Sequence, residues 1–296
     1  MQSFSRGWNF LKQSWQMVFK DKDLIKPSIY ALMVGTVVSL IGGVPFVLAA
    51  ILLGEKGAIS QVVMFILGVL LVFVNFLVSY IFSAMTVYLI FGYLAEGDGR
   101  MDKAWGIVRR DFFDIITLAA ASTAVNTFKN LVKGKGNKPG RNFLAGLIDT
   151  VWTEAAFLIL PAMIIEDINL KDGLKRAGYI IKNNLLLVGI STVGVKAVTG
   201  LISFLLVVTG VVLGLGIGYG LVSILWTAVF GLVIGIGLGV VIFFVFAMVA
   251  TIISTYTSTA YHTCLYLWAR DAERAQQTAG QAVTVAAPAP LAAVLK

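Results

Sequence analysis

The sequence has few of the residues from which catalytic and metal sites are built. Its 296 residues contain one cysteine, Cys264, and one histidine, His262. A single cysteine excludes an internal disulfide framework. Because the two residues are two positions apart, they fall on different faces of a helix, which argues against a zinc or haem site. Neither a Gly-x-Ser-x-Gly elbow nor a Gly-Lys-Ser/Thr phosphate loop occurs. We therefore expect no enzymatic activity, no metal and no cofactor.

Charged residues are scarce as well. They make up 13% of the chain against 58% hydrophobic residues, and the mean hydropathy is +0.90. Soluble domains carry about 25% charged residues. Only a lipid bilayer solvates so much apolar surface, so the composition excludes a soluble globular protein and predicts an all-α, polytopic membrane protein.

The charge that is present is mostly basic. The net charge of +8 comes from 23 Lys and Arg against 15 Asp and Glu. The basic residues cluster beside the apolar runs, which indicates contact with anionic lipid headgroups of the bilayer and not with nucleic acid. Five Lys or Arg precede residue 28, against one in the first turn. Both termini are therefore expected in the cytoplasm, in a multi-pass protein of the inner (cytoplasmic) cell membrane.

Residues 28–274 form the predicted membrane domain, with about six membrane helices. Apolar runs at 28–53, 58–94 and 185–268 are long enough to cross about 30 Å of hydrocarbon, the last of them more than once. A weaker hairpin over 112–165 either crosses twice or re-enters on the same side. Both alternatives leave the two termini on one side of the membrane.

The two ends of the chain differ from this membrane domain. Residues 1–27 form a basic amphipathic helix, predicted to lie in the headgroup region, with a soluble helix packed on the rest of the protein as the alternative. Residues 275–296 are a low-complexity tail rich in Ala, Gln, Val and Pro, expected to be disordered unless a protein partner holds it. The candidate membrane-surface anchors are Arg6, Trp8, Lys12 and Trp15.

Several motifs between residues 96 and 270 carry a family resemblance. In order they are Glu96-Gly97-Asp98-Gly99, Trp152, Leu160-Pro161, Glu166-Asp167, Gly173-Leu174-Lys175-Arg176-Ala177 and Leu265-Tyr266-Leu267-Trp268-Ala269-Arg270. This order resembles an uncharacterised family of prokaryotic polytopic membrane proteins, catalogued only as a domain of unknown function. The resemblance implies about six membrane helices and cytoplasmic termini, and it implies no activity.

Three charges lie inside apolar spans: Asp149, Glu154 and Lys196. An unpaired cation at the centre of a membrane helix costs at least about 2.5 kcal/mol. We therefore expect Lys196 to pair with Glu154 or Asp149. Such a pair is either part of an ion or proton path or a structural pair that sets the register of the helices.

Glycines repeat at four-residue spacing in the last apolar run. Nine of the thirty residues 210–239 are glycine, and such ridges let membrane helices approach closely. The helices in contact can belong to one chain or to two, and we expect self-association through these ridges. The predicted helix-packing glycines are Gly210, Gly214, Gly218, Gly231, Gly235 and Gly239.

Two polar lines follow the apolar helices. Asn75, Ser79 and Ser83 recur every four residues on the second span, where they either bond to a neighbouring helix or line a pore. A polar stripe on the last helix either borders a water-filled vestibule or is the wet half of a helix that enters the cytoplasm. The stripe consists of Thr251, Thr255, Ser258 and His262.

These features predict a non-catalytic, homo-oligomeric membrane protein that is channel-like or transport-related. The glycine ridges, the charges in apolar spans and the polar stripe favour that function. The alternative is a structural or scaffolding subunit whose amphipathic helix and tail dock a partner protein.

Overall fold

The computed structural model describes residues 2–53, 57–134, 138–183, 185–224, 230–279 and 285–295, and all regular secondary structure in them is helical. The elements are α1 (Gln2–Lys20), η1 (Lys22–Leu24), α2 (Lys26–Leu53), α3 (Ala58–Glu96), α4 (Met101–Arg110), α5 (Phe112–Lys133), α6 (Pro139–Glu166), α7 (Leu170–Asn183), α8 (Leu185–Ile224), α9 (Phe230–Ala279) and α10 (Ala289–Leu295).

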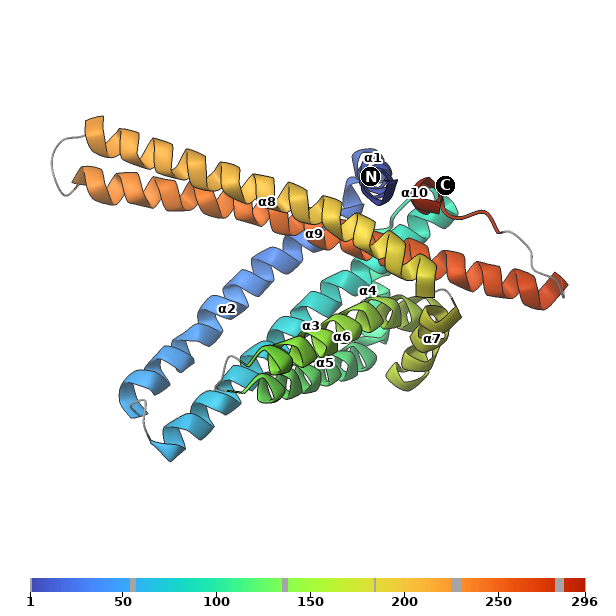
Figure 1. Ribbon diagram of the computed structural model, residues 1–296, viewed down its shortest axis with the longest axis horizontal. Helices are drawn as coiled ribbons and strands as arrows, with labels where there is room; N and C mark the ends of the chain where they lie inside the picture. Colours follow the sequence, from blue (N-terminus) through green and yellow to red (C-terminus); the bar gives the residue numbers. More distant parts are fainter. Residues whose placement is uncertain are drawn as a thin grey trace.

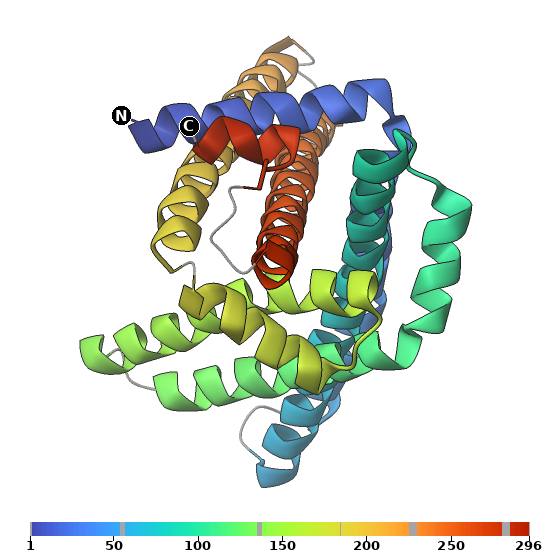
Figure 2. The same cartoon turned by 90° about the vertical axis from the view of Figure 1, so that its right-hand side faces the viewer.

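Three antiparallel hairpins make up the membrane domain (Figure 1). The α2/α3 and α8/α9 hairpins form two long arms that diverge from a shared end, which we call the inner end, toward their turns at the outer end. The α5/α6 hairpin packs against α3 and crosses it at an angle (Figure 2). Figure 2 looks along α8 and α9 and shows α5 and α6 lengthwise, so this third hairpin is steeply inclined to the α8/α9 arm.

The chain is an integral, multi-pass membrane protein. Among the described residues, five helical segments, not six, are long and apolar enough to cross a bilayer. The prediction of about six spans was therefore too high by one, because α5 carries Asp114, Ser122, Asn126 and Lys129 and is less apolar than the others. The five candidate spans are Lys22–Leu53, Ala58–Glu96, Pro139–Glu166, Val193–Leu221 and Val233–Thr278.

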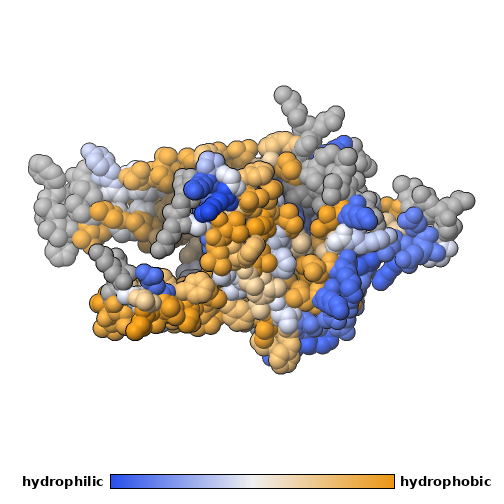
Figure 3. Space-filling view, turned by 60° about the horizontal axis from the view of Figure 1, so that its bottom comes forward, coloured by the Kyte–Doolittle hydropathy of each residue, from blue (hydrophilic) through white to orange (hydrophobic). Residues whose placement is uncertain are grey.

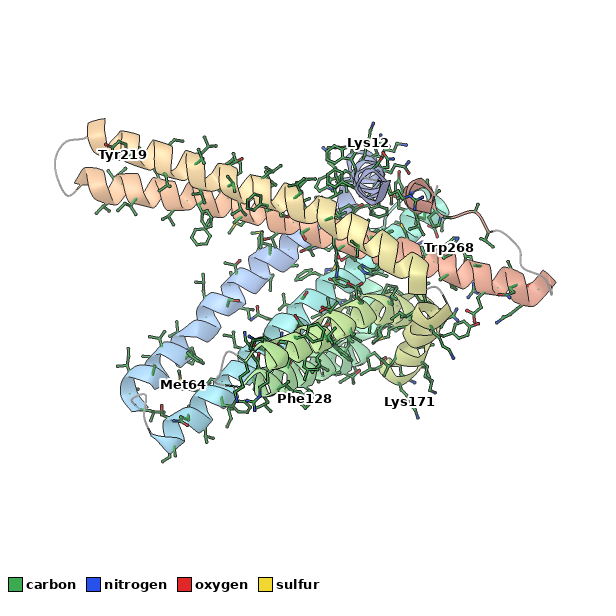
Figure 4. All side chains as sticks on the ribbon, viewed as in Figure 1. Lys12, Met64, Phe128, Lys171, Tyr219 and Trp268 are labelled. Atoms are coloured by element: carbon green, nitrogen blue, oxygen red, sulfur yellow. The ribbon has the colours of Figure 1, made fainter. Side chains whose placement is uncertain are left out.

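The arms expose apolar side chains on all sides. Leu52, Ile59 and Leu215 are 79%, 74% and 69% exposed, as expected for helices that face lipid and not water. In Figure 3 apolar colour covers both arms, and hydrophilic side chains gather at the inner end. Figure 4 labels Tyr219 near the outer end of the α8/α9 arm, and Lys12 and Lys171 toward the inner end.

Both termini lie at the inner end. There α1 runs across α8 and α9, and α10 lies beside α1 (Figure 2). Leu291 of α10 is fully buried. Within the predicted tail 275–296, the first residues form the last turn of α9, and Ala289–Leu295 form α10. Helix α10 packs on α1 and α9 of the same chain.

Helix α1 has two apolar faces. The inner face contains Phe10 and Ser14, both fully buried, and Tyr256 of α9 donates a hydrogen bond to the Ser14 carbonyl at 3.1 Å. The outer face keeps Trp8 and Phe19 48% and 77% exposed. The predicted anchor Trp8 lies on this outer face, and the inner face corresponds to the alternative of a helix packed on the protein.

The predicted anchor Trp15 lies between these two faces. Its indole N–H donates to the Thr257 hydroxyl at 3.3 Å, and its ring meets Tyr256 edge-on at 5.8 Å. It therefore attaches α1 to α9 and is not a free membrane anchor, whereas Trp8 and Lys12 remain exposed and Arg6 is half-buried.

Candidate functional site

Three charged or titratable side chains from three helices meet near the inner end. Glu154 of α6 accepts a hydrogen bond from Lys196 of α8 through Oε1, and its Oε2 lies 3.1 Å from Nε2 of His262 on α9. The structure thus pairs Lys196 with one of the two carboxylates named from the sequence. The Lys196 side chain is 45% exposed, so this ammonium lies at the edge of the bundle and not deep inside it.

His262 is the most enclosed member of this charge cluster. Its side chain is 2% exposed. Its ring stacks on Phe157 at 4.5 Å and meets Tyr261 edge-on at 5.1 Å. The four residues of the predicted polar stripe share a helix face, but α9 passes from α2 and α3 onto α6 along its length, so the end of the stripe at His262 is covered.

The two ring nitrogens of His262 both face acceptors. Nδ1 lies 2.7 Å from the Ser258 carbonyl oxygen, which can only accept, so Nδ1 carries a hydrogen. Nε2 faces the Glu154 carboxyl group. A neutral imidazole has a single N–H. Both contacts are hydrogen bonds when one proton is shared between Nε2 and the Glu154 carboxyl group.

A cavity of about 240 Å³ lies between α3, α5, α6 and α9. We call it the hydroxyl cavity, because its polar lining is Ser79, Ser83, Ser122, Asn126, Thr153 and Thr259. Ser122 lies at a junction in its wall. The Tyr80 hydroxyl is 2.7 Å from Ser122 Oγ, and the Trp152 indole N–H donates to the same oxygen at 2.9 Å.

An ion pair also lines this cavity. Lys129 of α5 donates to Asp149 of α6 at 2.8 Å, and the two side chains are 22% and 58% exposed. Asp149 therefore pairs across the α5/α6 hairpin and not with Lys196. Lys129 is not among the candidates predicted from the sequence, because its partner lies in the next helix.

A second, groove-like hollow of about 460 Å³ separates α9 from α2 and α3. Thr251 and Thr255 of the predicted polar stripe line it. Asn75 also lines it and accepts a hydrogen bond from Ser39 at 3.1 Å, which is the neighbouring-helix role considered for this residue. Ser79 lines both this groove and the hydroxyl cavity. The polar line of α3 therefore bonds to a neighbouring helix at Asn75 and borders both hollows at Ser79, and a pore along it stays a prediction.

The glycine ridges join α8 to α9 within one chain. A Cβ atom added to Gly214 would lie 2.5 Å from the Gly239 carbonyl oxygen, and one on Gly218 would lie 2.8 Å from that of Gly235. A Cβ on Gly210 would lie 2.7 Å from Phe246. The surroundings of Gly231 lie outside the described residues. Because the ridges already face each other, they give no support to contact between subunits, and self-association stays a prediction.

A second ion cluster at the inner end was not found from the sequence. Arg176 of α7 donates to Glu273 of α9 and, at 3.3 Å, to Glu166 of α6. Burial opposes the charge of Arg176, but hydrogen bonding and charge from the two carboxylates outweigh it and raise the pKa of the guanidinium. Arg176 and Glu166 are 10 positions apart and Glu273 is 97 away, so no local spacing marks them.

The His262–Glu154 contact is chemically able to hold a proton, and the polar side chains of the hydroxyl cavity can form hydrogen bonds with a polar solute. Within the described ranges, His, Cys, Asp and Glu side chains form no group of three that could hold a metal ion.

No protein-family model matches the sequence, and no curated protein is significantly similar to it. The family resemblance based on motifs stays a prediction, and function is inferred from the charge cluster and the two hollows.

Proposed function

We propose that this protein is a transport-related membrane protein that takes up a proton at the His262–Glu154 contact and a small polar solute in the adjacent hollows. The contact of His262 with two acceptors carries this proposal. Two acceptors face one enclosed imidazole at 2.7 and 3.1 Å, and an imidazole between two acceptors can pass a proton from one ring nitrogen to the other side. Lys196 adds a positive charge on the open side of Glu154, so protonation of the pair changes the local balance of charge.

The arrangement of the hollows supports a solute path over a purely structural role. Ser79 borders both hollows, so polar groups continue from the groove where the two arms diverge to the hydroxyl cavity. Ionisable residues beside a cavity within a membrane domain favour transport of ions or protons. A scaffolding role has less support, because α10 and the inner face of α1 are occupied by each other and by α9.

The proposed orientation puts the inner end in the cytoplasm. Basic residues are concentrated there, on α1, α4 and α7, in keeping with the positive-inside rule. The outer face of α1, with Trp8, Phe19 and Lys12 exposed, would then lie among anionic headgroups. His262 lies 32 residues from the start of α9, about 48 Å along the helix. This distance exceeds about 30 Å of hydrocarbon, so in this orientation the charge cluster would lie toward the cytoplasmic side of the membrane.

Proton flux tests the proposal. The purified protein is reconstituted in liposomes that contain a pH-sensitive dye, and a pH step is applied with and without candidate solutes. We expect flux above that of empty liposomes, reduced more than tenfold by Glu154→Gln. Glu96→Gln is the matched control, because Glu96 pairs with Lys103 at the exposed end of α3, away from both hollows. Equal flux in wild type and Glu154→Gln would refute the proposal.

Cysteine labelling in intact cells tests the orientation. Cys264 is buried, so it should not react with an impermeant maleimide. We expect Ala58→Cys, at the outer end of α3, to react from outside, and Gln16→Cys, on exposed α1, to react only after the cells are opened. The reverse pattern would invert the topology.

A further inference from the structure

The hydroxyl cavity contains a buried hydroxyl group that has no partner. Thr259 is 3% exposed, and its Oγ1 makes no hydrogen bond within the described part of the chain. Other threonines of α9 donate to the carbonyl one turn earlier: Thr263 does so to Thr259 at 2.7 Å, and Thr251 to Ala247 at 2.9 Å. A buried hydroxyl without a hydrogen bond is costly. Since Thr259 lines the cavity, a bound molecule can supply the missing bond.

The charges around this cavity select against ionic ligands. Lys129 and Asp149, which line it, neutralise each other at 2.8 Å. A ligand with a net charge would have to break this pair or leave its own charge without a counter-ion, and both are unfavourable in a membrane domain. The remaining polar groups are hydroxyls and the Asn126 amide, which donate and accept hydrogen bonds without charge.

The walls and the volume narrow the ligand further. Tyr80, Trp152 and Phe157 present aromatic surface to the cavity, which suits the C–H faces of a carbon skeleton. The volume of about 240 Å³ equals that of about eight water molecules at ~30 Å³ each. Molecules between the size of glycerol and that of a six-carbon ring fit this volume and present C–H groups to the aromatic walls.

We propose that the hydroxyl cavity binds a small uncharged polyhydroxylated solute, with the Thr259 hydroxyl as one of its hydrogen-bonding groups. This inference rests on the proposed function and names its substrate class. Phe157 connects the two sites, because it lines the cavity and stacks on His262 at 4.5 Å. A solute against Phe157 would therefore contact the ring that covers the proton site.

Equilibrium dialysis of radiolabelled glycerol and myo-inositol against the protein in nanodiscs tests this assignment directly. Dialysis is preferred to a thermal shift, because polyols stabilise proteins without binding to a site. We expect saturable binding of at least one of the two, weakened five- to tenfold by Thr259→Val. The matched control is Thr263→Val, one turn later on the same helix, whose hydroxyl bonds to its own helix. It should bind as the wild type does.

The Thr259→Val protein should fold, because the change removes a buried hydroxyl that has no partner. A second variant, Ser83→Leu, fills the cavity from α3 and should abolish binding. No saturable binding of either polyol, equal binding by Thr259→Val and wild type, or displacement of the polyol by gluconate or glycine betaine at lower concentration would each overturn the inference.

The same preparations separate this inference from the proposed function. If polyol binding is absent while Glu154-dependent proton flux persists, the cavity assignment fails and the transport proposal stands. If polyol binding follows the expected pattern but wild-type liposomes show no flux, the site stands as a solute-binding site and the transport proposal fails.

Discussion

The two halves of α9 meet opposite surroundings. In the outer half, Val233, Ile236 and Phe244 are 64%, 56% and 54% exposed, and contact with α8 runs through glycines. In the inner half, Tyr256, His262 and Tyr266 are at most 1% exposed, and α1 and α6 cover them. One helix is thus exposed to lipid at one end and packed against other helices at the other.

The difference shows which interactions can order a helix in each environment. Lipid is as apolar as leucine, so apolar side chains alone do not hold the outer arm together, and close backbone contact supplies the attraction. At the inner end hydroxyl, imidazole and carboxylate groups are enclosed, so they must find partners from other helices. Mutations should therefore act through steric contact in the arm and through charge and hydrogen bonds at the inner end.

The largest effect is expected from Gly239→Leu in the outer arm. A Cβ atom at this position would lie 2.6 Å from the Gly214 carbonyl oxygen, which belongs to a helix backbone and cannot rotate away. Overpacking of this kind costs about 3 kcal/mol, the upper end of the usual range. Thermal unfolding in nanodiscs, followed by tryptophan fluorescence, should show a much lower melting temperature.

Gly237→Ala is the control for that variant. Gly237 lies two residues away on the same helix, and a Cβ atom there meets nothing within 4 Å. Replacement of a helix glycine by alanine should stabilise the protein by about 0.5–1 kcal/mol. If Gly239→Leu kept its stability and instead converted an oligomer to a monomer, the ridges would join subunits and not the two helices of one arm.

The next largest effect is expected from Arg176→Gln at the inner end. The change leaves Glu166 and Glu273, 19% and 20% exposed, without their shared cation. We expect a loss of about 2 kcal/mol, less than for a fully buried pair because water still screens the carboxylates. Chemical unfolding of the detergent-solubilised protein measures it.

Two further variants isolate the charge effect. Lys175→Gln removes the neighbouring cation, which is 67% exposed and pairs with exposed Asp172, so it should cost less than about 0.5 kcal/mol. Adding Glu273→Gln to Arg176→Gln removes one of the two stranded carboxylates and should restore part of the stability. No recovery in the double variant would mean that Arg176 acts by packing.

The features of the arms could be read from the sequence because they are local. Long apolar runs predict the spans, and glycines four residues apart predict a close helix contact, whichever helix provides the other side. Counting α5 as a sixth span was an error of the opposite kind, because it concerns partners that are not local. Polar residues lower the hydropathy of α5, and α3 and α6 supply hydrogen-bond partners for some of them, as Tyr80 and Trp152 do for Ser122.

The polar interior was only partly predictable. From the cost of an unpaired cation in a membrane helix, we expected Lys196 to pair with Glu154 or Asp149, and it pairs with Glu154. The choice of Glu154 over Asp149 depends on Lys129, and the position of His262 depends on the path of α9 across α6. Both are set by helix packing, which periodicity does not encode.

A smaller effect is expected where α1 meets the inner half of α9. Tyr256→Phe removes the hydroxyl that donates to the Ser14 carbonyl and leaves the ring against Trp15. Loss of this buried hydrogen bond should cost about 1 kcal/mol. Tyr219→Phe in the outer arm, where the side chain is 77% exposed, should leave the unfolding curve unchanged. Equal curves for both variants would mean that the hydrogen bond from Tyr256 to Ser14 does not help to hold α1 on α9.

The smallest effect is expected at the start of α7. Asn169 accepts from the Asp172 backbone N–H at 3.1 Å and donates to its carboxylate at 3.2 Å, in a reciprocal cap.

The hydrogen bond from Lys175, with its charge, lowers the pKa of Asp172 below its ordinary value of 3.8. A carboxyl group whose pKa is lower in the folded than in the unfolded state stabilises the fold. This stabilisation is complete above the unfolded-state pKa and is lost as the pH falls through the folded-state pKa. Asp172→Asn should therefore lower the melting temperature slightly at about pH 6, and the difference from the wild type should shrink as the pH falls through the folded-state pKa of Asp172. Because both proteins share every other titrating group, the difference between their melting curves measures Asp172 alone. A difference that grew toward acid pH would show that the Asp172 carboxylate opposes folding.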